Sequence, residues 1–110
     1  MALSRLERPQ WQAYFDGMSK LLDGKRAEIE VDALAIGSQI EAEWVPLLGI
    51  TYDPKGDVVD VALEGLGHLI HKPREVYVEQ VATSVNSVEV IGSDDVRHII
   101  RLREPLMLPS

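Results

Sequence analysis

The hydrophobic pattern of this chain changes once, from a helical repeat to a two-residue repeat, and it does not change back. Pro9 suits the first turn of a helix, and Gly24 suits the left-handed residue that often follows a helix end. Between them, large apolar residues recur at helical spacing: Trp11, Tyr14, Phe15, Met18, Leu21 and Leu22. The spacing predicts one amphipathic helix over residues 9–22, whose apolar face must pack on another layer.

After the helix, apolar and polar residues alternate in short segments, which is typical of half-buried strands. The predicted strands span residues 26–32, 38–45, 48–53, 57–64, 75–80, 86–92 and 97–103. Pro46 is expected to interrupt any continuation of the second segment and to mark an edge, a bulge or a bend, because proline cannot donate to a ladder. Turn signals at residues 53–57 and 92–95 predict two hairpins.

No second helix is available to connect parallel strands, so the sheet should be antiparallel. We therefore predict an α+β fold with residues 1–110 in one domain, in which the helix packs on a sheet of six or seven strands. An alternative is that the sheet curls into a partial barrel with the helix closing one end. The apolar tail, residues 105–109, either lies over the core or is available to a partner.

The charge balance excludes several classes of function. With 11 basic and 18 acidic residues the net charge is −7, which argues against binding to a phosphate backbone or to an anionic membrane. The absence of cysteine excludes disulfides and thiol nucleophiles. The N-terminus lacks a signal-peptide pattern, and the longest uncharged stretches are under half of the roughly 20 residues that a spanning helix needs. We expect a soluble, cytoplasmic protein.

The acidic excess is concentrated in residues 28–64, which contain nine carboxylates and a single basic residue, Lys55. Near the C-terminus, Arg97, Arg101 and Arg103 share one strand face. One interpretation is that these charges pair across neighbouring strands. The other is that the acidic segment meets a basic partner, or that the arginine row holds an anion.

Three histidines, His68, His71 and His98, could form a metal or acid–base site if they converged with a carboxylate. A spacing of three residues in a strand or loop places His68 and His71 on opposite sides, which favours exposed turn histidines instead. No motif for a nucleophilic serine, a dinucleotide or calcium is present, so we expect no metal and no cofactor. Tyr77 shares a face with Glu75, which places its ring on the polar side of a strand, within reach of a ligand or partner.

Five blocks of sequence together resemble a family of short bacterial proteins classed as a domain of unknown function. The blocks are LERPQW (6–11), EAEWVPLLGITYDP (41–54), VALEG (61–65), HLIHKPRE (68–75) and LREPL (102–106). The resemblance implies a bacterial protein and brings no activity, cofactor or catalytic residue. Its most distinctive polar block, residues 68–75, adds Lys72 and Arg74 to the residues of interest.

The function that these features favour is a non-catalytic binding or protein-interaction module, with a second copy or another protein as partner. Segregated charge, the apolar tail and the lack of a catalytic motif point to it. The alternative is a small-ligand or metal-dependent enzyme that uses the three histidines. The candidate contact residues are His68, His71, Lys72, Arg74, Glu75, Tyr77, Arg97, Arg101 and Arg103.

Overall fold

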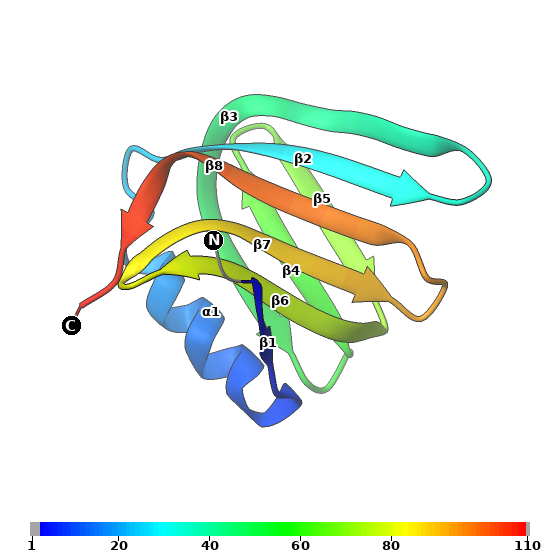
Figure 1. The fold of residues 1–110 in the computed structure, drawn as a ribbon, viewed down its shortest axis with the longest axis horizontal. Helices are drawn as coiled ribbons and strands as arrows, with labels where there is room; N and C mark the ends of the chain where they lie inside the picture. The colour runs from blue at the N-terminus through cyan, green and yellow to red at the C-terminus, as the bar shows by residue number, and fades with distance from the viewer. Residues whose placement is uncertain (1–2, 110) are drawn as a thin grey trace.

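One antiparallel sheet and one short helix make up the computed structural model, which describes residues 3–109 (Figure 1). Eight strands are hydrogen-bonded in the order β1-β6-β7-β8-β2-β3-β4-β5. They are β1 (Leu3–Leu6), β2 (Arg26–Ala33), β3 (Gly37–Asp53), β4 (Val58–Leu63), β5 (Leu66–His71), β6 (Pro73–Val81), β7 (Ser84–Gly92) and β8 (Arg97–Met107). The predicted α+β class is confirmed, but the sheet has eight strands rather than six or seven.

Strand β3 belongs to both layers of the sheet. The first layer contains β1, β6, β7, β8, β2 and the first half of β3, and the second layer contains the second half of β3 with β4 and β5. Its first half pairs with β2 as far as Pro46, and its second half pairs with β4 from Leu47 onward. Trp44 has a φ of 53°, a left-handed conformation that is costly for a residue with a side chain, at the point where the strand changes partner. Figure 1 shows β3 crossing the top of the molecule and then descending behind the other strands. The sheet therefore curls, but within residues 3–109 no ladder joins its end strands β1 and β5.

The two strands predicted on either side of Pro46 form one strand, β3, but the edge, bulge or bend expected there is present. The strand changes partner at this point, and its ladder with β4 is irregular between Leu47 and Gly49. Pro46 lies at the last pair of the β2–β3 ladder, opposite Arg26, where a missing N–H costs little. Its carbonyl still accepts a hydrogen bond from the Glu64 N–H at 3.0 Å. Two further strands, β1 and β5, lie outside the predicted set, and β5 begins directly after a turn at Gly65 (φ 75°).

Helix α1 (Trp11–Ser19) is shorter than the predicted helix over residues 9–22. The 3₁₀ turn Arg8–Gln10 precedes it, and isolated turns continue the apolar stripe to the buried Leu22. Ser19 attaches the end of the helix to β3, since its Oγ accepts from the Ile50 N–H at 2.9 Å and donates to the Ile50 carbonyl at 2.6 Å. No helix within residues 3–109 is long and apolar enough to cross a membrane.

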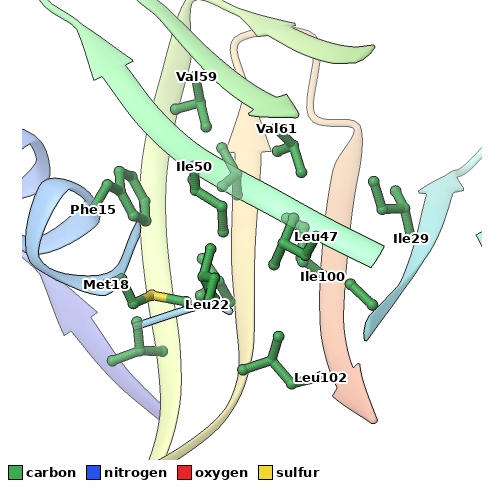
Figure 2. Packing of buried hydrophobic residues seen from close by; sticks show 14 of the residues in the cluster. Phe15, Met18, Leu22, Ile29, Leu47, Ile50, Val59, Val61, Ile100 and Leu102 are labelled. Carbon is green, nitrogen blue, oxygen red and sulfur yellow. The ribbon is translucent and has the colours of Figure 1, made fainter. Parts of the chain in front are cut away.

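The core lies between the two layers and the helix (Figure 2). Phe15, Met18 and Leu22 pack against residues of β3, β4 and β8. Burying one such side chain contributes about 1.5–3 kcal/mol, so this shared core is what holds the layers together. The C-terminal tail also reaches the core, because Leu106 is buried opposite Val85 in an extended β8.

Candidate functional site

Two of the three histidines meet between the layers of the sheet. Nε2 of His68, on β5, lies 2.9 Å from Nδ1 of His98, on β8, and one ring N–H donates to the other ring. Both are half-buried strand residues rather than the exposed turn residues predicted from the sequence. His71 is exposed, three residues along β5 from His68, and so faces the other side of the strand.

Burial keeps the two paired imidazoles neutral near pH 7. It lowers the pKa of His68, although the charge of Glu41 opposes the change. It also lowers the pKa of His98, to about 4, where proximity to His68 adds to the effect and Asp94 opposes it. No group of three or more histidine or carboxylate side chains that could hold a metal occurs in the part of the chain that the structure describes. The geometry therefore gives no support to an enzyme that uses all three histidines.

The arginines of β8 are divided between two environments. Arg101 is paired across the strands, with Nη1 at 3.2 Å from Glu28 and 2.6 Å from Glu30. Arg97 lies 3.7 Å from Glu89 of β7. Arg103 has no ion pair and no side-chain hydrogen bond to any residue within 3–109. The first two arginines fit the cross-strand pairing interpretation, whereas Arg103 does not.

The pairing of Arg101 changes the chemistry of its acidic neighbours. Its hydrogen bond holds the pKa of Glu30 down to about 2, and a hydrogen bond donated by the Ser38 hydroxyl adds to the effect. The buried Oδ1 atom of Asp32 has no hydrogen-bond partner in residues 3–109. Glu28 and Glu30 therefore share a single guanidinium as their counter-charge.

The distinctive block at residues 68–75 lies on the rim of the sheet, where β5 passes into β6. Lys72 is exposed and adopts a φ of 51°, while its backbone N–H donates to the Asp57 carbonyl at 2.8 Å. Arg74 forms ion pairs with Asp95 and with Glu75, the latter at 3.3 Å. The Arg74 side chain is therefore engaged in ion pairs within the fold, and the Lys72 backbone holds the β5–β6 connection against Asp57.

Tyr77 does not offer a free hydroxyl to a partner. Its O–H donates to Glu75 at 2.7 Å, which raises the pKa of Tyr77 and lowers that of Glu75. Arg5 of β1 lies opposite Tyr77 in the β1–β6 ladder. The tyrosine is half-buried rather than exposed.

A polar clasp that the sequence analysis missed joins the N-terminus to the second layer. The Arg8 guanidinium donates to the Tyr52 hydroxyl at 3.0 Å, to Asp57 at 3.2 Å and to the Pro73 carbonyl at 2.8 Å. It also stacks 4.4 Å from the ring centre of Trp11. Tyr52 in turn donates to Asp57 at 2.8 Å. The signal available in the sequence was that these residues fall in or near three of the distinctive blocks, 6–11, 41–54 and 68–75.

Comparison with known proteins supplies the family. Residues 2–110 match the family described as "Family of unknown function (DUF5335)". The chain belongs to DUF5335. An uncharacterized protein of the bacterium Aquifex aeolicus (strain VF5) is 39% identical over 111 residues, which cover 100% of both chains. No solved structure matches this DUF5335 member. The resemblance carried by the five sequence blocks is thus confirmed, and DUF5335 itself brings no assigned activity.

Proposed function

We propose that this DUF5335 member is a non-catalytic protein-interaction module and that the β2–β3 hairpin is its contact element. The hairpin projects from the body of the molecule (Figure 1). Its tip carries Leu34, whose exposed fraction is 105%, and Ile36, at 61%. Ile40, further along β3, is 49% exposed. Single exposed apolar residues are common, but three on one projecting hairpin favour a surface that is covered by a partner.

The backbone of the same hairpin supports this assignment. Residues 37–45 of β3 pair with β2 on one side, whereas β4 pairs with β3 only from Leu47 onward. Among the described residues, the other side of this first half of β3 therefore carries no ladder. An open strand edge offers N–H and C=O groups to an extended segment of another protein.

The charge of the open half of β3 indicates which kind of partner would bind at this edge. Glu41 and Glu43 are both exposed on the open half of β3. An added strand that carries lysine or arginine would be attracted to them, whereas a second copy would place like carboxylates against each other. The partner that we propose is therefore a basic, extended protein segment, and not another copy of the chain.

A peptide of alternating lysine and valine tests this proposal by fluorescence anisotropy. We expect saturable binding that weakens as salt is raised, and no binding of the matched glutamate–valine peptide. Leu34→Ser combined with Ile36→Ser should weaken binding at least tenfold. The control Leu48→Ser, at a residue that is 62% exposed outside the hairpin tip, should change it less than twofold. Failure of the lysine peptide to bind, or equal weakening in the control, would refute the proposal.

Light scattering tests the alternative occupant. The proposal predicts a monomer at high protein concentration. A stable dimer that dissociates in the Leu34→Ser, Ile36→Ser variant would assign the hairpin to a second copy and contradict the basic partner.

A further inference from the structure

The charge pattern between β2 and β8 reverses at one end of the ladder. In the register of these strands, Asp32 lies opposite Arg97, and Glu28 lies opposite Arg101. On β2, Arg26 lies two residues before Glu28, and on β8, Arg103 lies two residues after Arg101. An acidic residue thus faces an arginine at two positions of the ladder, whereas at its end both strands carry a cation.

These two arginines line one small hollow on the surface. The hollow has a volume of about 220 Å³ and is lined by Gly24, Lys25, Arg26, Arg103 and Glu104. Three of its lining side chains are cationic and one is acidic, which leaves an excess of two positive charges in a chain of net charge −7. Like charges gathered in this way are destabilising, and the one carboxylate among them, Glu104, offsets only one of the three positive charges.

The chain holds two of these cations in place without neutralising them. Arg26 donates from Nη1 to the Trp44 carbonyl at 3.1 Å, and Lys25 donates from Nζ to the Pro105 carbonyl at 3.3 Å. Backbone carbonyls orient a donor but leave its full charge. Arg103 has no ion pair or side-chain hydrogen bond within residues 3–109, so its guanidinium remains available.

A bulge in β8 makes room for the hollow. Ser87 pairs with Arg101 and Val85 pairs with Leu106, so two steps along β7 correspond to five steps along β8. The extra residues, which include Arg103 and Glu104, leave the β7 ladder there. Bulges of this kind redirect side chains and occur frequently beside functional sites.

We propose that this hollow binds a small oxyanion through Lys25, Arg26 and Arg103, and that a phosphate group is the chemical class it accepts. Guanidinium groups bind the oxygens of phosphate with paired hydrogen bonds, and an ammonium group adds a point charge. The size of the hollow admits inorganic phosphate or the phosphate end of a small ester. Its position at the start of β2 is distinct from the hairpin tip at the other end of that strand.

Calorimetric titration of the full chain at constant ionic strength tests the site. Inorganic phosphate and glycerol 3-phosphate serve as probes, and chloride keeps the ionic strength fixed. We expect saturable binding of at least one probe, and the tighter probe shows whether the free ion or the ester is preferred. Arg103→Gln and Arg26→Gln should each weaken binding at least tenfold.

Arg97→Gln is the matched control, because it removes the same charge from the same strand outside the hollow. It should change the affinity less than twofold. Thermal unfolding in phosphate against chloride gives a second readout: phosphate should raise the Tm of the unmodified chain and leave that of Arg103→Gln unchanged. Absence of saturable binding of both probes, or equal weakening in all three variants, would overturn the proposal.

Discussion

Nε2 of His68 lies 2.9 Å from Nδ1 of His98, and this contact joins β5 to β8 across the two layers of the sheet. Both side chains are half-buried, and the pKa of each is lowered. The contact needs at least one neutral ring, because two protonated imidazoles have no acceptor nitrogen, and protonation of either half-buried ring is unfavourable. Its consequences for stability can be measured directly.

Acidification should destabilise the protein through this pair. The pKa of His98 is about 4 in the folded chain, compared with an ordinary value of 6.5, so between these pH values the unfolded chain binds a proton that the folded chain does not. The free energy of unfolding should therefore fall as pH drops from about 6.5 towards 4, by about 1–2 kcal/mol once the half-exposure of the ring is allowed for. Urea unfolding at pH 7 and pH 5 measures it.

The His98→Gln variant is the control for this pH dependence. Without the titrating ring, the decrease between pH 7 and pH 5 should be smaller than in the unmodified chain. The carboxylate of Glu30 does not affect the comparison. Because its pKa is lowered from 4.5 to about 2, its contribution to the free energy of unfolding changes only below about pH 4.5. An unchanged pH dependence in His98→Gln would show that the pair is not its source.

Arg101→Gln should destabilise the fold because it leaves Glu28 and Glu30 without their cation. Both carboxylates are largely buried, with side-chain exposed fractions of 17% and 16%. We expect a loss of about 1–3 kcal/mol in the free energy of unfolding, together with a rise in the pKa of Glu30 towards its ordinary value. Carboxyl-carbon NMR across a pH titration reports the second effect.

Arg97→Gln provides the comparison for that loss. Its 3.7 Å contact with Glu89 is long and its side chain is 51% exposed, so its removal should cost less than about 0.5 kcal/mol. Equal losses in the two variants would contradict the distinction between the paired Arg101 and the exposed Arg97.

Tyr52→Phe tests the N-terminal clasp. The hydroxyl of Tyr52 accepts from Arg8 and donates to Asp57, and the residue is only 7% exposed. Its removal should lower the free energy of unfolding by about 1 kcal/mol while leaving the ring in place. In Tyr77→Phe the lost hydroxyl contacts a single carboxylate on a more exposed face, and the same urea measurement should show a smaller loss.

Ala82→Gly should stabilise the turn between β6 and β7. Ala82 has a φ of 54°, where a side chain is strained and glycine is not. Because glycine also costs more conformational entropy, the net gain should be at most about 1 kcal/mol in thermal or urea unfolding. A clear loss of stability would mean that the turn does not hold this conformation in solution.

Local pattern was enough to predict the helix, the antiparallel sheet and the shared face of Arg97 and Arg101, because each depends on periodicity within a segment. The contact between His68 and His98 could not be predicted from the pattern within either strand. It depends on the bend in β3 near Trp44, which brings β5 over β8, and nothing in the alternation of residues marks a left-handed tryptophan.

The separation of Arg103 from the other arginines has a similar cause. Strand parity groups it with Arg97 and Arg101, and only the bulge in β8 shows that it leaves the β7 ladder. The clasp around Arg8 joins three segments that are distant in sequence, so its residues carried no local signal beyond their place in or near distinctive blocks.

Amide hydrogen exchange measures whether the open edge of β3 accepts a basic extended segment. With the lysine–valine peptide bound, outward-facing amides within residues 37–43 should exchange more slowly, since they would donate to the added strand. Amides elsewhere in the sheet should be unaffected. Unchanged exchange in residues 37–43, or protection only on another face, would contradict the account.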